Sequence, residues 1–390
     1  MSRRPRLGDY FENRQEPGRE GLPTLSVTMN DGLILRDEIE RRTETTLLPD
    51  QHLLVRRGDI AYNMMRMWQG ACGLAESDGL VSPAYVVLTP KAGIDSRFAY
   101  HWFKSGRMTY LLWAYSHGLT EDRLRLYFDD FAEIPIAPPP LEQQRRIVAV
   151  LDTWDRAIDQ IERLIAAKRR RVRALVMKYA AEFHGERVEF GELVDLISER
   201  IKPGTAGVPN TSIELENIES MTGRIIGTEP VSAESALRSR FKVGDTLFGK
   251  LRPYLGKFAA PEFAGICSTE IWVLRSKRAR LDPSLLPFIV QTQEFFAAAT
   301  IQSGSKMPRA DWELVSAAPV PCPRDTNRQA EAANLLTVAF NAARPEYHKL
   351  ASLKVQKKEL LKRLTGGEWQ LDDRFDDTPP SHSDLAGAVA

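Results

Sequence analysis

Cysteine is scarce in this sequence, and long apolar segments are missing. The only cysteines among 390 residues, Cys72, Cys267 and Cys322, lie far apart, so we expect neither a disulfide framework nor a zinc site, and a reducing cytoplasm as the compartment. No apolar run approaches the roughly 18 residues that a membrane span requires. The first residues, MSRRPRLGDYF, are charged without an apolar segment behind them. We therefore expect no signal peptide and no membrane partner.

The sequence also lacks an excess of charge of one sign. It contains 53 basic and 52 acidic residues, for a net charge of +1. This balance does not indicate a nucleic-acid-binding protein. It does not exclude one either, because the local field determines such binding.

Catalytic motifs are missing as well. There is no glycine-rich phosphate loop followed by Lys-Ser/Thr and no Asp/Asn-Pro-Pro-aromatic tetrad. A metal-dependent nuclease site beginning at Pro49-Asp50 would need a later acidic residue two places before a lysine, which does not occur. His52, His101 and His117 are scattered. We therefore expect a binding protein without catalytic residues, a metal or a cofactor.

What the chain does contain is an internal repeat. The segment GDIAYNMMRMWQG at Gly58 is answered 186 residues later by GDTLFGKLRPYLG at Gly244. Similar matches join LGDYFENRQEPG with FGELVDLISERIKPG, LVSPAYVVL (80–88) with ICSTEIWVL (266–274), and EIPIAPPP (133–140) with AAPVPCP (317–323). SHGLTEDR (116–123) aligns with QSGSKMPR (302–309), which pairs Arg123 with Arg309. A dozen matches in register predict one unit present twice.

Each copy ends in a heptad-patterned helix. Seam positions alternate in steps of four and three at Ile147, Leu151, Trp154, Ile158, Ile161, Ile165, Lys168, Val172, Leu175 and Tyr179. The second seam is Leu336, Ala339, Ala343, Leu350, Leu353, Lys357, Leu360 and Leu364. Pro345 predicts a break near residues 341–345. An antiparallel pair with the globular parts at opposite ends is the simplest way to bury both stripes; alternatively, each helix packs on its own domain.

Short β-rich segments, separated by Gly, Pro and Asp turns, dominate both globular parts, and a helical stretch follows late in each. The predicted fold class is therefore α+β, with two tandem α/β domains separated by two long helices in a pseudo-twofold antiparallel coiled coil. The polar, acidic residues 367–390 are expected to be disordered.

The repeated loops combine arginine, glycine and aromatic residues. Arginine binds phosphate or guanine bidentately, and glycine allows close backbone approach. The candidate DNA-binding residues are Tyr62, Asn63, Arg66, Trp68 and Arg123 in the first copy, and Lys250, Arg252, Tyr254, Lys257, Ser303, Lys306 and Arg309 in the second. Alternatively, the aromatic residues belong to the core and the Gly-Asp pairs to turns. The run KRRRVR (168–173) is either a solvated helix face or a docking or DNA-backbone stripe.

The chain resembles the specificity subunits of type I restriction-modification enzymes. The tandem unit, the segments GDIAYNMMR and GDTLFGKLRPYLGK, and the junction IPIAPPPLEQQRRIVAVLDTWDRAIDQIERL carry this resemblance, and the junction is its most specific part. It implies target recognition domains at residues 1–140 and 184–322, and spacer helices at 141–183 and 323–366. At the second junction only Arg328-Gln329 is kept, which predicts a shorter or bent second spacer.

The resemblance also implies a non-catalytic subunit that directs partner enzymes to an asymmetric bipartite target in double-stranded DNA. Two modification subunits, which carry S-adenosylmethionine and methylate one adenine in each half-site, would be its partners, and restriction subunits would join them. An alternative of another class is a coiled-coil scaffold with two protein-binding lobes. It accounts for the neutral net charge and the heptads, but not for arginine and glycine recurring in register with aromatic residues.

Overall fold

The chain divides into two compact units. Unit 1 comprises Met1–Gln160 and Leu350–Ala390, and unit 2 comprises Ile161–Lys349. The structure, a computed structural model, describes residues 4–29, 31–38, 47–120, 123–205, 207, 209–232, 235–301, 307–366 and 371. Apart from Leu371, the predicted disordered tail lies outside the described residues. No helix in these ranges is both long enough and apolar enough to cross a membrane.

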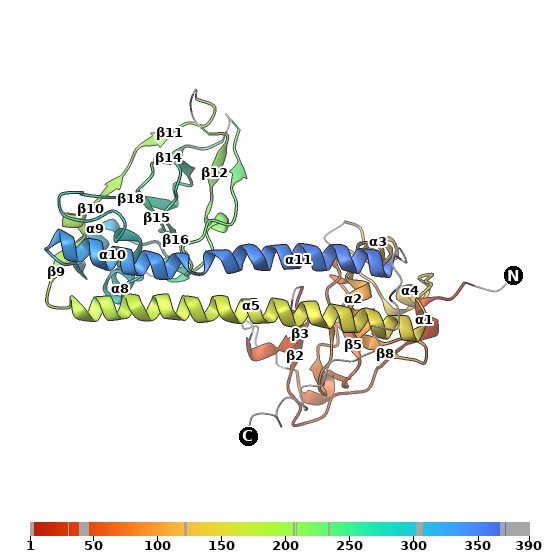
Figure 1. The fold of residues 1–390 in the computed structure, drawn as a ribbon. Helices are drawn as coiled ribbons and strands as arrows, with labels where there is room; N and C mark the ends of the chain where they lie inside the picture. Colours follow the sequence, from red (N-terminus) through yellow and green to blue (C-terminus); the bar gives the residue numbers. More distant parts are fainter. Residues whose placement is uncertain are drawn as a thin grey trace, which may run out of the picture. The chain divides into compact units, whose positions relative to one another are not determined.

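Unit 1 is built around an antiparallel sheet with the strand order β1-β8-β5-β6. The two central strands, β5 and β8, are labelled in Figure 1. Two further sheets have two strands each, β2-β3 and β4-β7, and their strands fall between β1 and β8 in the sequence. The strands are β1 (Phe11–Asn13), β2 (Leu25–Val27), β3 (Leu33–Leu35), β4 (Leu53–Val55), β5 (Ile60–Asn63), β6 (Cys72–Leu74), β7 (Gly79–Val81) and β8 (Tyr85–Pro90). The helices are α1 (Leu7–Tyr10), α2 (Ser96–Phe103), α3 (Gly106–Ala114) and α4 (Phe128–Ala132), with short 3₁₀ turns η1 (Arg36–Glu38), η2 (Pro49–Gln51) and η3 (Met67–Gln69).

Unit 2 repeats this sheet in the order β10-β18-β15-β16 and adds a five-stranded sheet, β11-β14-β17-β12-β13, and the pair β19-β9. The strands are β9 (Arg187–Glu189), β10 (Val194–Ile197), β11 (Arg200–Ile201), β12 (Thr211–Ile213), β13 (Glu229–Pro230), β14 (Arg238–Phe241), β15 (Thr246–Gly249), β16 (Phe258–Ala259), β17 (Gly265–Cys267), β18 (Ile271–Ser276) and β19 (Pro319–Pro321). The helical elements are α6 (Phe190–Leu193), α7 (Leu286–Ile289), α8 (Gln293–Ala299), α9 (Trp312–Ser316), η5 (Leu215–Asn217) and η6 (Pro253–Leu255). The predicted duplication and the α+β class are confirmed.

Equivalent contacts recur inside the two units. The Lys91 ammonium donates to the Gly8 carbonyl at 3.0 Å, and the Lys277 ammonium to the Gly191 carbonyl at 2.7 Å. Each bond joins the residue after the longest strand of the four-stranded sheet, β8 or β18, to the first short helix of the domain, α1 or α6. The repeat is therefore preserved in hydrogen bonds as well as in strand order.

The Gly-Asp pairs form the predicted turns ahead of β5 and β15. Gly58 and Gly244 adopt φ angles of +92° and +91°, a region that favours glycine. Both aspartates are 2% exposed and accept the backbone N–H three residues earlier at 2.8 Å. Asp59 also accepts from Arg14, and Asp245 from Arg275, at 2.7 Å each. These bonds fix the start of the strand that leads into each candidate loop.

The long helices are α5 (Leu141–Glu182), α10 (Thr326–Asn341) and α11 (Arg344–Thr365). The break predicted near residues 341–345 is confirmed, because α10 ends at Asn341 and α11 begins at Arg344, with Pro345 in its first turn. Every predicted seam position is buried or half-buried.

Each unit contains an antiparallel helix pair. In unit 1, the Gln143 side chain donates to the Leu371 carbonyl, and Asp155 pairs with Lys357. A residue later in α5 therefore contacts a residue earlier in the C-terminal segment, as in an antiparallel pair. In unit 2, Lys168 on α5 donates to the Ala342 carbonyl at 2.7 Å and pairs with Glu346. A polar residue in a heptad seam specifies register. The antiparallel coiled coil is confirmed.

The helices also pack on the globular parts, as in the alternative prediction. Ile147, Val148 and Leu151 join the unit 1 core, and Ala333 and Leu336 join the unit 2 core. The apolar face of each helix therefore packs both on the other helix of the pair and on the core of the globular domain.

A buried glutamine fixes each helix to its domain. Gln144 is fully buried; its amide oxygen accepts from the Asp95 N–H at 2.8 Å, and its amide nitrogen donates to the carbonyls of Gly93 and Pro139 at 3.0 and 2.8 Å. Gln329, 1% exposed, makes the equivalent bonds. It accepts from the Asp282 N–H at 2.8 Å and donates to the carbonyls of Arg280 and Pro323 at 2.9 and 2.7 Å. The divergent second junction thus keeps the residue that makes this connection.

A buried histidine in unit 1 should make stability depend on pH. His101 on α2 is 7% exposed, and burial, followed by the charge of Lys357, lowers its pKa from 6.5 to about 4; Lys104 and Arg97 also lower this pKa, and Asp155 opposes them. Because the unfolded chain binds this proton more tightly, the free energy of unfolding should fall as pH decreases through this window. Between pH 7 and 4.5, unit 1 should lose about 2 to 3 kcal/mol from this group.

The measurement is urea unfolding of the protein and of His101→Gln at both pH values. The variant lacks the titrating ring, so its loss between pH 7 and 4.5 should be smaller by that amount. Equal losses in the two proteins would show that His101 is not buried in its neutral form.

Candidate nucleic-acid interface

In unit 1 the candidate loop follows β5 and contains the turn η3. Asn63 accepts the Met65 N–H through its side-chain oxygen at 3.0 Å, and Met67 is fully buried. Gly70 closes the turn with φ +83°. Arg66, between these anchors, is exposed. The loop is therefore held at both ends and presents a guanidinium between them.

In unit 2 the equivalent loop follows β15 and contains η6. Arg252 adopts φ +51° and ψ +59°, a left-handed conformation that costs a non-glycine residue about 1–2 kcal/mol. Gly256, at φ +56°, closes the turn, and its carbonyl accepts the Met221 N–H at 3.0 Å. Strain retained at one residue by a rigid surrounding structure is typical of functional positions.

A later segment of each unit is hydrogen-bonded to its loop. The Leu126 N–H donates to the Met64 carbonyl at 3.0 Å, and the Ala310 N–H to the Lys250 carbonyl at 2.8 Å. In unit 2 the Arg252 N–H also donates to the Pro308 carbonyl at 2.8 Å. The loop and the segment ahead of α4 or α9 therefore form one surface in each unit.

These bonds correct one sequence alignment. Leu126 is equivalent to Ala310, so the residue equivalent to Arg309 is Arg125 and not Arg123. The repeat offset has already fallen to 184 at this point, as it has in the later EIPIAPPP match. Arg125 is exposed. The sequence alignment did not select it, because an offset of 186 was applied to a segment where the true offset is 184.

Tyr62 does not belong to this surface, contrary to the prediction. Its side chain is fully buried and packs on Phe131 with a ring-centroid distance of 5.7 Å. Burial, followed by the charge of Asp130, raises the pKa of its hydroxyl. On β5, Tyr62 faces the core because alternate residues of a strand point to opposite faces.

Three other candidates are partly engaged in local contacts. The Trp68 indole N–H donates to the Met65 carbonyl at 3.1 Å, and the Lys257 ammonium to the Leu215 carbonyl at 2.6 Å. Both side chains are half-buried, as is Asn63. They position the loops, and contacts with DNA stay a prediction for them.

The exposed candidates are Arg66, Arg123, Arg252, Tyr254 and Arg309. Lys250 is half-buried, and Ser303 and Lys306 lie outside the described residues. Arg309 pairs with Glu270 at 2.9 Å. The position equivalent to Glu270 in unit 1 is Ala84. Among the described residues, neither Arg66 nor Arg252 has an ion pair, so these two equivalent arginines are alike in this respect.

Among the residues that the structure describes, one group of side chains has the composition of a metal site. Ligand atoms of His101, Asp152 and Asp155 lie within 4.8 Å of one another. Asp152 is paired with Arg97 at 2.9 Å, and Asp155 is paired with Lys357. The two cations already neutralise the carboxylates, so the group is better explained as an ion-pair network between α2, α5 and α11.

Comparison with known proteins agrees with the family predicted from the sequence. The family model described as the type I restriction modification DNA specificity domain matches residues 26–168. The specificity subunit of the type I restriction enzyme EcoDI from Escherichia coli is 28% identical over 140 residues, which cover 35% of this chain and 30% of that protein. The chain thus matches less than a third of the length of this curated relative.

One solved structure shares the fold of this chain, and a second one aligns with it less closely. A chain from a study of complex assembly and conformational transition of the type I R-M system aligns with a TM-score of 0.51 at 17% identity, over 95% of this chain and all of the other. The type I restriction-modification S subunit from M. genitalium aligns with a TM-score of 0.49 at 16% identity, over 93% and 96% of the two chains. The first of these alignments supports the two-domain architecture with long helices.

Proposed function

We propose that this chain is a DNA sequence-specificity subunit. The premise is the match of residues 26–168 to the family model of type I restriction modification DNA specificity domains. It recognises an asymmetric bipartite target in double-stranded DNA. Each unit reads one half-site, and the paired helices set the distance between them. Residues 1–140 and 184–322 are the two target recognition domains, and residues 141–183 and 323–366 are the spacers.

One observation carries the proposal. Both units hold an arginine at the start of a 3₁₀ turn after the same sheet strand, close that turn with a left-handed glycine, and bond it to a second segment. Arginine is the residue best suited to bidentate contact with guanine or phosphate. A repeated, rigid loop with an exposed arginine is what a pair of DNA readers requires.

The divergence of the surfaces supports an asymmetric target. Arg309 is held by Glu270, whereas the equivalent Arg125 has Ala84 at that position. Arg309 has a carboxylate partner, whereas Arg125 has no ion pair with any residue that the structure describes, so the two guanidiniums present different hydrogen-bond donors to a base edge. The two half-sites should therefore differ.

The chain itself is non-catalytic in this proposal. Two modification subunits and, in a restricting complex, translocating restriction subunits supply the chemistry, in the cytoplasm. The relative named above is a specificity subunit of such an enzyme, and the chain's sequence contains none of the catalytic motifs considered above.

Replacing Arg66 by alanine should relax sequence preference in one half-site alone. The assembled complex would be tested by methylome sequencing after co-expression with an adenine methyltransferase from the same source. Removing one base-edge contact should weaken DNA binding by about 1–3 kcal/mol, with the other half-site still read. Gln69→Ala, an exposed change in the same turn, is the matched control.

Equal relaxation at both half-sites would contradict the assignment of one unit to each. Binding that is unchanged in Arg66→Ala would remove this loop from the interface. A scaffold with protein-binding lobes would give no sequence-dependent DNA binding at all in the assembled complex.

A further inference from the structure

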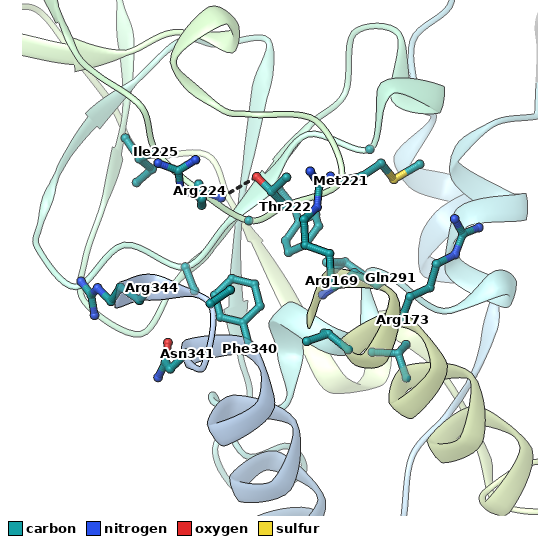
Figure 2. Close-up of a pocket in the computed structure, with 18 of the residues that line it drawn as sticks. Arg169, Arg173, Met221, Thr222, Arg224, Ile225, Gln291, Phe340, Asn341 and Arg344 are labelled. Atoms are coloured by element: carbon teal, nitrogen blue, oxygen red, sulfur yellow. Dashed lines mark hydrogen bonds between the residues drawn. The ribbon is translucent and has the colours of Figure 1, made fainter. Parts of the chain in front are cut away.

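Unit 2 contains a pocket that the DNA-reading loops do not explain. It has a volume of about 910 Å³ and lies between the second half of α5, residues 221–225, α8 and the junction of α10 with α11. This size is within the usual range for small-molecule sites. Figure 2 shows Arg169 and Arg173 on α5, with Phe340 and Arg344 from the α10–α11 junction beside the same cavity.

The walls of the pocket are mainly aromatic and aliphatic. Phe258, Phe296, Phe340 and Tyr347 contribute rings, and Val172 and Val176 contribute aliphatic side chains. A Cβ at Gly223 would lie 2.8 Å from Phe258 and 2.9 Å from Phe340, so the backbone closely contacts this aromatic wall. Such a surface favours a flat apolar or aromatic body.

The rim of the pocket carries excess positive charge. Arg344 is paired with Glu262 at 2.9 Å, and Arg224 is paired with Glu219 and lies over the Tyr347 ring at 3.6 Å. Arg169, Arg170 and Arg173 also line the pocket. These three are exposed and have no ion pair or side-chain hydrogen bond with any residue that the structure describes. Neighbouring guanidiniums without acidic partners suit a phosphate, which they can bind bidentately.

Comparison of the two copies of the repeat shows that the apolar wall of this pocket has no equivalent in unit 1. The buried glutamines Gln144 and Gln329 place equivalent helix residues 185 apart. At that offset Phe340 corresponds to Asp155 and Val172 to Lys357, which in unit 1 form an ion pair. Two apolar wall positions of the pocket are thus charged in unit 1, so the pocket is not a general consequence of the helix packing.

We propose that this pocket binds a nucleotide-sized aromatic phosphate. The aromatic ring lies against the Phe258 and Phe340 wall, and the phosphate lies at Arg169 and Arg173. A DNA duplex is too wide to enter a cavity of this volume, whereas a single nucleotide fits within it. The site is independent of the proposed DNA recognition.

The test is isothermal titration of the full chain with the four nucleoside 5′-monophosphates, the matching nucleosides and inorganic phosphate. At least one nucleotide should bind with a Kd on the order of 10–100 µM, at least tenfold more tightly than its nucleoside or phosphate alone. Arg169→Ala/Arg173→Ala should weaken this binding at least tenfold. Ala297→Trp, which fills the pocket without removing a charge, should also abolish it.

Lys358→Ala is the matched control, because Lys358 is the exposed unit 1 equivalent of Arg173; it should leave the Kd unchanged. The proposal is overturned if no nucleotide binds below 1 mM, on the order of the weakest specific affinities, or if nucleoside and nucleotide bind equally. It is also overturned if the arginine variant weakens DNA binding while no nucleotide binds, because the arginines would then contact the DNA backbone.

Discussion

Arg252→Gly should weaken DNA binding without destabilising unit 2. The side chain is exposed and its backbone is left-handed, so removing it should cost about 1–3 kcal/mol of binding, roughly 5- to 150-fold in Kd. Glycine adopts this conformation without strain. Because the unfolded chain also gains freedom, the free energy of unfolding should be unchanged or raised by up to about 1 kcal/mol.

Arg252→Ala is the matched variant, since it removes the same guanidinium but keeps the left-handed strain. Both variants should bind DNA equally weakly, and only the glycine variant should recover stability. Filter binding over a salt series distinguishes the contact: loss of a phosphate contact lowers the salt slope by about one, whereas loss of a base contact relaxes sequence preference. Unchanged affinity in both variants would show that the strain has a purely structural origin.

Gln144→Ala should destabilise unit 1 by about 2–4 kcal/mol. The substitution removes the fully buried Gln144 amide and leaves the Asp95 N–H and the carbonyls of Gly93 and Pro139 without their side-chain partner. A buried polar group left unsatisfied costs about 1–3 kcal/mol, and the sum is reduced here because Asp95 and Pro139 are only half-buried and Gly93 is exposed. The start of α5 should also detach from α2, because the glutamine joins them.

Urea unfolding and amide hydrogen exchange at residues 93–98 measure this effect. Glu142→Ala, an exposed change in the same turn, should alter stability by no more than about 0.5 kcal/mol. Gln329→Ala should reproduce the loss in unit 2. A loss confined to one of the two glutamine variants would show that the two connections are not energetically equivalent.

The positions of the two candidate loops, after β5 and β15, were predictable from the sequence, but only some of the residues that they expose were. Gly58, Gly70, Gly244 and Gly256 mark each turn in the sequence, because few other residues adopt the required φ. The sequence could not show that Tyr62 faces inward, since an aromatic residue beside arginine is compatible with either face until the sheet register is known. Arg125 was missed because weak repeat matches do not locate a two-residue shift.

By itself, the sequence determined the duplication, the helix seam and the break at Pro345, because periodicity and proline act locally along the chain. Only the tertiary structure decided which seam residues also enter a domain core, and that Gln144 and Gln329 make equivalent connections despite divergent junctions. It also decided that Phe340 and Val172 line a pocket in unit 2 while Asp155 and Lys357 pair in unit 1. Contacts between residues far apart in the chain depend on packing, and a one-dimensional pattern does not specify them.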